Sequence, residues 1–391
     1  MGTANAHALG RSLRFFAKKE TTVGSAYGTD NQEAVSANAV AGADACKVLA
    51  SGIEFTVEQR DRNDSRTTRQ MLKRIAGKQD VTWSCESYLL PAGSTTAPDL
   101  DGLIECAMGA AFSTNSYSLG DTLSTARIMR TASGVFREDL FGAWVEEMKI
   151  SASGGDEPKL SFSGGAFNYA LTGTSTSTGT PDSDTIPVTT GEGVNFMVGS
   201  VIDVNGDTTV VTSKSAADTL EVKSGTYATA EDIIPTTYTE ATLGDPINGI
   251  GGSLVLDSQT LPITAFDVTL TNGVKAINDE AFEKGTSDFI PGFRSVKGSV
   301  TVRARIDFIK ALAKRYTQLA ATDTPTFSDL TITVTLGNVS GKQCVVTLNN
   351  CELEFGAIDL PESEEGVLNI PFTAFGSGGS NDEMTFAWNQ G

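Results

Sequence analysis

The stretch GIEFTVE (residues 52–58) and the stretch TAFDVTL (residues 264–270) show the same alternation of apolar and polar side chains. Alternation with a period of two is typical of a β-strand with one buried face. We align Phe55 with Phe266. After each stretch the sequence predicts the same series of elements: a long polar loop, a second strand, an amphipathic helix and three further strands.

The two series also end in similar stretches. LSFSGGAF (residues 160–167) and LNIPFTAF (residues 368–375) share Leu, Ala and Phe. Ala166 is aligned with Ala374, at nearly the same separation along the chain as the two strands that open the series. Internal similarity at both ends of two long segments predicts tandem copies of one small β-rich domain.

The predicted fold is mainly β, with a β-sandwich or half-barrel and one helix in each copy. Apolar residues at helical spacing mark the two helices: Leu100, Leu103, Ile104, Ala107 and Met108 in the first, and Ile309, Leu312, Ala313 and Tyr316 in the second. The expected domains are an N-terminal arm (residues 1–50), copy one (51–172), a linker with a small inserted β-barrel (173–251) and copy two (252–391). Residues 172–190 are rich in Ser, Thr, Gly and Pro, which is typical of a linker.

The amino-acid composition excludes several classes of function. The 391 residues contain 48 acidic and 29 basic side chains, and the net charge of −19 argues against binding nucleic acid through its phosphates. Five scattered cysteines show neither metal-ligand spacing nor a disulfide framework. The one histidine, His7, lies in the expected arm, outside both cores. We therefore expect no enzyme, no catalytic residue, no metal site and no cofactor.

The N-terminal sequence lacks the apolar stretch of a signal peptide. No run of about 18 apolar residues occurs in the chain, so the sequence predicts no membrane segment.

Acidic residues recur at polar positions of the expected strands: Glu54, Glu58, Asp80, Glu86, Glu352 and Glu354. Two interpretations stay open. The residues form an ordinary solvated face, or they form an electronegative surface along which DNA passes without adhering.

The loop at residues 59–78 is long for a hairpin connection, which usually takes about two to five residues. Its basic residues far outnumber the acidic ones, whereas the loop at residues 273–297 has equal numbers of both. The basic loop is either a solvated run of charge or an arm that docks on an acidic neighbouring copy, and we favour docking. The candidate contact residues are Arg60, Arg62, Arg66, Arg69, Lys73, Arg74, Lys275, Phe282 and Phe289.

In these features the chain resembles the tail tube proteins, or major tail proteins, of long-tailed bacteriophages. The resemblance rests on RSLRFFAKKETTVGSAYGT (residues 11–29), on the strand pairs with long loops, on the PDLDGLIECAMG helix (residues 98–109), and on PITAFDVTLTNGVKAINDEAFEKGTSDFIPGFRSVKGSVTVR (residues 262–303). It covers both copies and the arm, whereas residues 191–251 lie outside it.

The resemblance implies a structural virion protein whose rings stack into a hollow tube for DNA delivery. In that family each domain adds strands to a continuous inner barrel, and the helices pack outside. Two domains in one chain imply a trimeric ring with pseudo-sixfold symmetry, an inserted domain that projects outward, acidic strand faces along the lumen, and long loops between rings. The implied partners are further copies, the tape measure, tail terminator and distal tail proteins, and DNA in transit. The implied location is the virion tail, after assembly in the host cytoplasm.

Two other functions are kept as alternatives. A tail- or capsid-decorating protein would have the same β-domains without a lumen. A carbohydrate-binding adhesin of tandem β-sandwiches would need an exposed aromatic platform, but Trp83, Trp144 and Trp388 are scattered along the sequence, two of them in strands expected to be buried.

Overall fold

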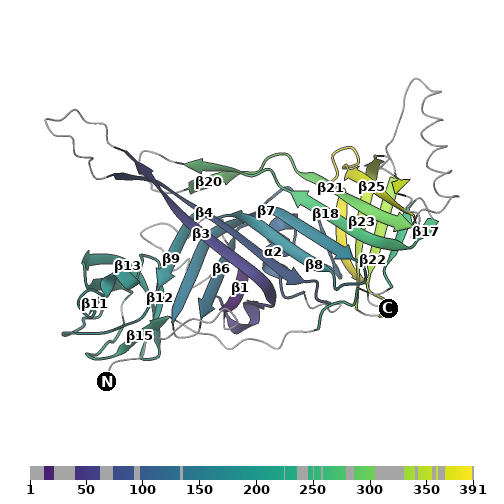
Figure 1. The fold of residues 1–391 in the computed structure, drawn as a ribbon. Helices are drawn as coiled ribbons and strands as arrows, with labels where there is room; N and C mark the ends of the chain where they lie inside the picture. The colour runs from purple at the N-terminus through teal and green to yellow at the C-terminus, as the bar shows by residue number, and fades with distance from the viewer. Residues whose placement is uncertain are drawn as a thin grey trace.

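The structure is a computed structural model. It describes residues 13–21, 40–61, 74–91, 97–132, 135–223, 225–235, 245–249, 251–256, 259–278, 286–303, 330–339, 342–354, 358–359 and 366–389. The fold is mainly β, as predicted, and one large antiparallel assembly of strands runs across the molecule (Figure 1).

A central sheet joins the two halves of the chain. Its strand order is β3 (Val48–Arg60), β4 (Ile75–Tyr88), β8 (Lys159–Gly165), β7 (Phe136–Ser153), β18 (Ile263–Thr271), β21 (Ser295–Arg303) and β25 (Val367–Ala374). Beyond β25 lie the end of β23 (Gln343–Leu353) and the short β24 (Ile358–Asp359). The β7–β18 ladder connects the halves through seven residue pairs, from Ala265 opposite Ser153 to Thr271 opposite Glu147.

Each half adds a second layer to this sheet. In the first half, the beginning of β7 pairs with β6 (Ala126–Ala132) and β9 (Asn168–Thr172), and β6 pairs with β1 (Leu13–Lys19), which also meets β2 (Ala45–Cys46). In the second half, the beginning of β23 pairs with β22 (Leu330–Leu336) and β26 (Met384–Asn389), and β22 pairs with β16 (Ser253–Leu256). The strands β17 (Gln259–Leu261) and β5 (Ser116–Ser118) complete this layer. The main hydrophobic core contains residues from both halves.

The order of strands is the same in the two halves. β3–β4–β8–β7 is followed across the sheet by β18–β21–β25–β23, and the layers β1–β6–β7–β9 and β16–β22–β23–β26 also correspond. The ladders even share their irregularities. Register shifts lie between Val48 and Ala50 in β3–β4, between Ile263 and Ala265 in β18–β21, between Ala126 and Ile128 in β6–β7, and between Leu330 and Ile332 in β22–β23.

These shifts correct our alignment of the opening strands. Ala50 and Ala265 each follow the register shift, so Phe55 corresponds to Leu270 and not to Phe266. The sequence alignment was wrong by four residues. An even displacement keeps every side chain on its own face of the strand, and the hydrophobic pattern alone does not reveal it.

Helix α2 (Asp101–Met108) packs its buried side chains, among them Leu103 and Ile104, against the layer that contains β1 and β7. Gly109 ends the helix in the left-handed conformation, with φ of 78°. This is the helix predicted for copy one. The helix predicted around Ile309 and Leu312 lies outside the described residues.

A second sheet of six strands lies at one end of the molecule, beside the first half (Figure 1). Its order is β10 (Ser175–Thr176), β15 (Asp232–Pro235), β12 (Val201–Val204), β13 (Asp207–Ala216), β14 (Thr219–Val222) and β11 (Thr185–Pro187). It has its own core, which includes Phe196 and Ile202, and a one-turn 3-10 helix at Gly193–Asn195. β10 and β11 fall in the expected linker, so residues 175–187 belong to this small sheet and do not form a free connection.

The expected N-terminal arm also differs from the structure. β1 pairs with β6 over seven positions and buries Phe15 and Phe16, while Gly42–Asp44 form a short 3-10 helix that leads into β2. The apolar side chains of β1 complete the layer under α2. This part of residues 1–50 is therefore integral to the first half.

Candidate functional site: the polar face of the central sheet

The central sheet has one apolar and one polar face, and we call the outward side chains of β3, β4, β8, β7, β18, β21, β25 and β23 the polar face. Val81, Trp83 and Cys85 point into the core, whereas Thr82 and Ser84 are exposed. One row of cross-strand neighbours crosses the face from β4 to β23: Glu86, Ser161, Lys149, Thr269, Lys297, Thr373 and Glu352. The face thus runs through both halves without interruption.

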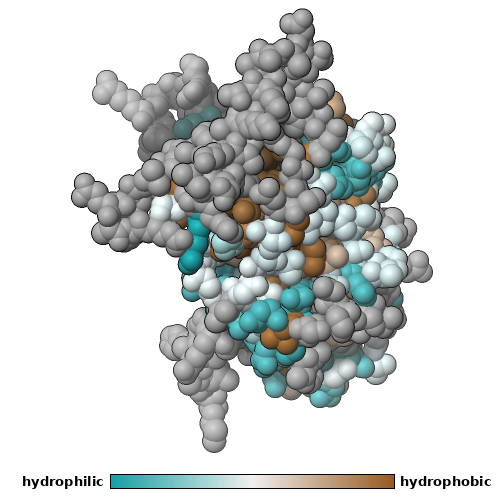
Figure 2. Space-filling model, turned by 90° about the vertical axis from the view of Figure 1, so that its right-hand side faces the viewer, coloured by the Kyte–Doolittle hydropathy of each residue, from teal (hydrophilic) through white to brown (hydrophobic). Residues whose placement is uncertain are grey.

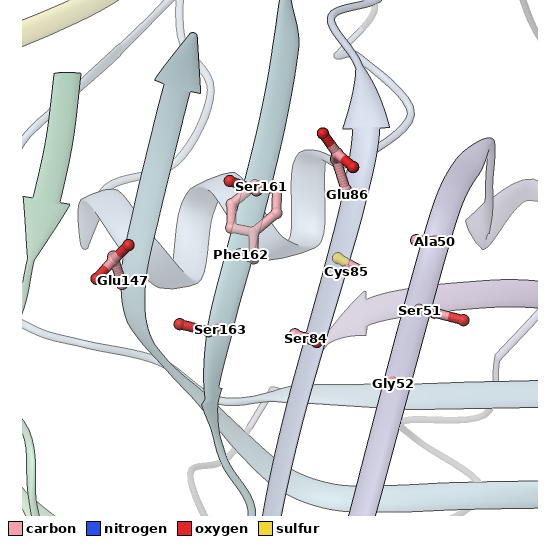
Figure 3. A pocket seen from close by; sticks show the side chains of 10 residues that line it. All are labelled: Ala50, Ser51, Gly52, Ser84, Cys85, Glu86, Glu147, Ser161, Phe162 and Ser163. Carbon is pink, nitrogen blue, oxygen red and sulfur yellow. The ribbon is translucent and has the colours of Figure 1, made fainter. Parts of the chain in front are cut away.

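A depression of about 550 Å³ lies on this face over β3, β4 and β8. Its floor is low because β3 contributes Gly52 and Ala50 and the neighbouring strands contribute serines. Figure 3 shows Glu86 on β4 and Glu147 on β7 on either side of Ser161 and Ser163. The polar rows that line this depression offer carboxylates and small hydroxyl groups.

Four of the six predicted acidic residues, Glu54, Asp80, Glu86 and Glu352, lie on the polar face, and Glu354 directly follows β23. Glu54, Asp80, Glu352 and Glu354 are exposed, and Glu86 is half-buried at 3.1 Å from Lys159 Nζ. Glu58 differs, because it lies next to a register shift in β3 and its Oε2 accepts a hydrogen bond of 3.0 Å from Arg60. That bond lowers the pKa of the Glu58 carboxyl.

The sequence pattern missed several charges of the polar face. Glu147 and Asp267 add negative charge, and Asp267 Oδ1 accepts a hydrogen bond of 2.6 Å from Ser299. Lys149 and Lys297 lie in the same rows and add positive charge. These residues could have been found from the alternation of β7, β18 and β21, but their faces are assigned only once the register of each strand is known.

The predicted loop contacts lie on two hairpins. β3 and β4 continue into the first loop, so Gln59 pairs with Ala76, and Arg74 Nε lies 2.7 Å from Asp61 Oδ1. Arg62, Arg66, Arg69 and Lys73 lie outside the described residues. In Figure 1 this hairpin extends beyond the body of the sheet.

The second loop contains a hairpin of β19 (Lys275–Asn278) and β20 (Thr286–Ile290). Lys275 is exposed, and Phe282 lies outside the described residues. Phe289 is buried against Trp144 and Phe167, with ring centroids 6.1 and 5.9 Å apart. Its side chain therefore anchors the hairpin to the first half, which disagrees with a role in contacts between rings.

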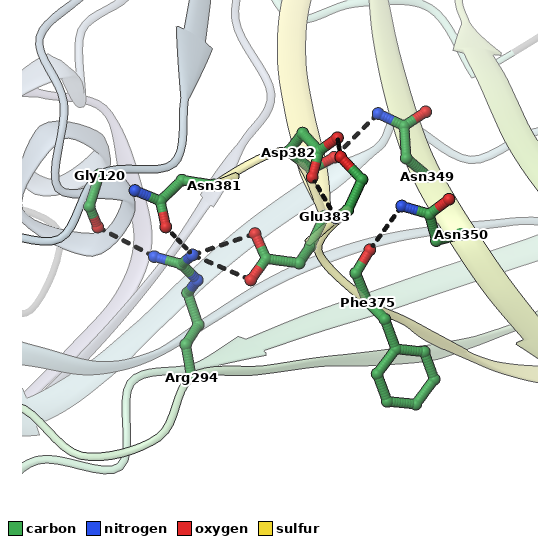
Figure 4. A network of polar contacts seen from close by, with 9 residues as sticks. Gly120, Arg294, Asn349, Asn350, Phe375, Asn381, Asp382 and Glu383 are labelled. Carbon is green, nitrogen blue, oxygen red and sulfur yellow. Dashed lines mark hydrogen bonds and ion pairs between the residues drawn. The ribbon is translucent and has the colours of Figure 1, made fainter. Parts of the chain in front are cut away.

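A polar brace holds the end of this hairpin to both halves (Figure 4). Arg294 donates hydrogen bonds to the carbonyl oxygen of Gly120 at 2.9 Å, to Asn381 Oδ1 at 2.9 Å and to both carboxylate oxygens of Glu383. Gly120 follows helix α2, whereas Asn381 and Glu383 precede β26. The brace thus ties together segments far apart in the sequence.

Other kinds of site have little support in the described part of the chain. All five cysteines are buried, and burial raises the pKa of the Cys85 and Cys351 thiols to about 12. Within the described ranges, no group of His, Cys, Asp and Glu has the geometry of a metal site. The helical residues that the structure describes include no segment long and apolar enough to span a membrane.

Comparison with known proteins adds no family. No protein-family model matches the sequence. The curated proteins contain no significant match to it.

Proposed function

We propose that the chain is a tail tube subunit: a tandem duplication of one tube domain, three copies of which close into a ring that stacks into a hollow tube. The observation that carries the proposal is that the two halves have the same strand order and share register shifts at corresponding positions of two ladders, and that a seven-residue ladder joins them edge to edge. A ladder like the one between β7 and β18 can also join the second half of one chain to the first half of the next chain.

The free edges of the central sheet support closure of a ring. In the described part of the chain, β3 pairs only with β4, so one side of this 13-residue strand has no partner strand. The opposite edge of the sheet is formed by the end of β23 and by β24. Open edges invite pairing with other chains, and a closed ring removes them. A head-to-tail contact of this kind is heterologous and closes when the rotation per subunit divides a full turn.

The polar face supports its use as the lumen. It combines small hydroxyl side chains with acidic residues and with lysines, Lys149 and Lys297 among them, and the whole chain has a net charge of −19. Such a surface repels phosphates and offers DNA few groups to which it can adhere. The proposed partners are further copies of this chain and the other tail proteins, in the virion tail.

The first test is assembly of the purified protein. We expect hollow filaments of constant diameter in electron micrographs, and a three-fold average with six similar lobes in end views. Sedimentation of the same sample should show species larger than one chain of 41.0 kDa. A protein that remains monomeric at all concentrations and forms no filaments would overturn the proposal.

The lumen assignment predicts the effect of charge reversal on the polar face. The triple variant Glu54→Lys, Glu86→Lys and Glu352→Lys should make assembled tubes retain short DNA that is protected from nuclease, because lysines attract phosphates. Retention should decrease steeply with salt. The matched control is Asp182→Lys, Asp207→Lys and Asp232→Lys, three exposed positions, of which Asp207 and Asp232 lie in the six-stranded sheet and Asp182 in the loop before β11. Equal amounts of protected DNA in the two variants would contradict the assignment.

A decorating protein remains the alternative for the same fold, and micrographs without a hollow axis would favour it.

The adhesin alternative has less support. Trp83, Trp144 and Trp388 are all buried, at 3%, 7% and 3% exposure, and none can form a sugar-binding platform. On the end of the molecule formed by the second half, teal and white residues predominate among those described, with brown ones in small groups between them (Figure 2).

A further inference from the structure

We infer that the junction between neighbouring chains repeats the β7–β18 junction inside one chain, so that β3 of one copy pairs antiparallel with β24 of the next. The inferred register places Gly52 opposite Asp359 and Ile53 opposite Ile358. The inference rests on the proposed ring, to which it adds the residue-level pairing between subunits.

β3 corresponds to β18 in the second half. Both strands have a register shift against the next strand, and Ala50 and Ala265 are the first residues after it. Counting on from these alanines, Gly52 corresponds to Asp267 and Ile53 to Val268. β18 pairs with β21 on one side and with β7 on the other, whereas β3 has only β4 in the described structure.

β24 corresponds to the end of β7 in the first half. From the Val145–Gly164 pair to the Ile150–Leu160 pair, β7 advances five residues while β8 advances four. From the Leu353–Phe372 pair to the Ile358–Leu368 pair, the β23–β24 segment also advances five residues while β25 advances four. The described pairs on either side therefore have the same offset in the two segments.

This correspondence assigns β24 a place in the sheet. Ile358 corresponds to Ile150, and Asp359 to Ser151. In addition, the backbone N–H of Glu354 donates a hydrogen bond of 2.9 Å to the carbonyl oxygen of Pro371, so the edge continues beyond β23.

The β7–β18 ladder supplies the register for a pairing of β24 with β3. Within the chain, Asp267 lies opposite Ser151 and Val268 opposite Ile150. Replacing each residue of these pairs by its counterpart in the other half gives Gly52 with Asp359 and Ile53 with Ile358.

The burial of equivalent residues supports a missing neighbour beside β3. Val268 and Leu270 are each 1% exposed, because β7 lies next to β18. Their counterparts Ile53 and Phe55 are only partly buried. Removing apolar surface from water is favourable, so Ile53 and Phe55 favour a strand that covers them. The covering strand comes from a second copy of the chain. Its β24 corresponds to the end of β7, and β7 is the strand that pairs with β18, the counterpart of β3.

The test uses paired cysteines. Gly52→Cys with Asp359→Cys should form disulfides between chains on mild oxidation, giving bands at two and three chain masses on a non-reducing gel. Ser151→Cys with Asp267→Cys is the matched control, since the same junction lies within one chain and its disulfide should leave the chain mass unchanged. Glu54→Cys with Asp359→Cys is displaced by two residues and should cross-link much less. The native cysteines are buried and give a low background.

The outcomes separate the register from the function. Tubes in micrographs, with a closed control pair but no cross-link between residues 52 and 359, would overturn the register and leave the tube intact. A monomeric protein without tubes or cross-links would overturn both. If neither pair oxidises, spin labels at the same four positions decide: equal distances in the two pairs support the register, and a longer distance between residues 52 and 359 overturns it.

Discussion

Asp139→Asn is expected to destabilise the protein by about 3–5 kcal/mol, since it removes the carboxylate that pairs with the buried guanidinium groups of Arg127 and Arg137. Asp139 Oδ1 accepts hydrogen bonds from Arg127 at 3.1 Å and from Arg137 at 2.7 Å, and Oδ2 accepts one from Arg137 at 2.6 Å. The three side chains are at most 1% exposed. Without the carboxylate, two positive charges would remain buried close together. Urea denaturation of the variant and the wild type measures the loss.

Glu138→Gln is the matched control for this variant. Glu138 is the neighbouring residue on β7 and pairs with Arg130 at 2.5 Å, but the two side chains are 11% and 16% exposed. Water can solvate the charge that is left, so the loss should be clearly smaller. A loss for Asp139→Asn no larger than that for Glu138→Gln would show that the buried cluster contributes little to stability.

The same cluster predicts an acid-sensitive component of stability. Burial raises the pKa of Asp139, but Arg137 and Arg127 outweigh it, so the net pKa lies below its ordinary value. As the pH falls, Asp139 of the unfolded chain therefore binds a proton at a higher pH than Asp139 of the folded chain does. This component is fully present above the unfolded pKa of about 3.9 and is lost as the pH falls through the folded pKa. Asp139→Asn should lack this part of the acid dependence.

The sequence predicted the parts of the fold that follow from strong alternation. Ile53, Phe55 and Val57 on one face of a strand were enough to predict β3, and the stripe that includes Leu103 and Ile104 predicted α2. β1 was missed because its buried residues Phe15 and Phe16 are adjacent and do not alternate. The strand exists because both of its faces are covered, which depends on residues remote in the sequence.

The linker prediction failed for a related reason. Residues 172–190 have the composition of a flexible connection, yet Ile186 and Val188 enter the core of the six-stranded sheet. Two apolar residues among Ser, Thr and Gly give no periodic pattern, and their burial depends on partners such as Phe196 and Leu220. Composition describes the average of a segment, whereas its structure depends here on the burial of a few apolar side chains.

The charged cluster at Asp139 could not be predicted from local sequence either. Arg127 lies 4.9 Å from the centroid of the Phe141 ring, and Phe141 packs against Val201 and Val210 of the small sheet. This sheet belongs to the segment that separates the two halves. The corresponding positions of the second half, Thr331 for Arg127 and Thr347 for Asp139, are uncharged. The polarity of each position therefore depends on what covers that layer.

A large and a small residue exchange places between the two halves. Trp83 on β4 lies opposite Gly164 on β8, and at the corresponding positions Gly298 on β21 lies opposite Phe372 on β25. A Cβ atom on Gly298 would lie 2.7 Å from the Phe372 ring and 2.1 Å from the carbonyl oxygen of Asp267. Each half thus fills the same site in its core with one aromatic ring, supplied by different strands.

This exchange predicts strong coupling between Gly298→Trp and Phe372→Gly. Phe372→Gly should cost at least about 3–5 kcal/mol through the cavity that it leaves, and Gly298→Trp should cost about 1–3 kcal/mol or more through overpacking. The double variant places the aromatic ring on the strand that corresponds to β4 and removes the clash with the Phe372 ring, while the close contact with the carbonyl oxygen of Asp267 remains in both variants that carry Gly298→Trp. Its indole N–H can donate to the carbonyl oxygen of Thr373, as Trp83 Nε1 does to Gly165 at 3.0 Å. We expect the double variant to lose at least about 1 kcal/mol less than the sum of the single losses.

Denaturant unfolding of the four proteins in this cycle measures the coupling. A second cycle that combines Phe372→Gly with Val204→Ala is the control, because Val204 lies in the core of the six-stranded sheet at the other end of the molecule (Figure 1). Distant substitutions add within about 0.3–0.5 kcal/mol. Simple additivity in the Gly298–Phe372 cycle would mean that the two halves do not share interchangeable core positions. That result would weaken the duplication on which both the ring and its inferred register depend.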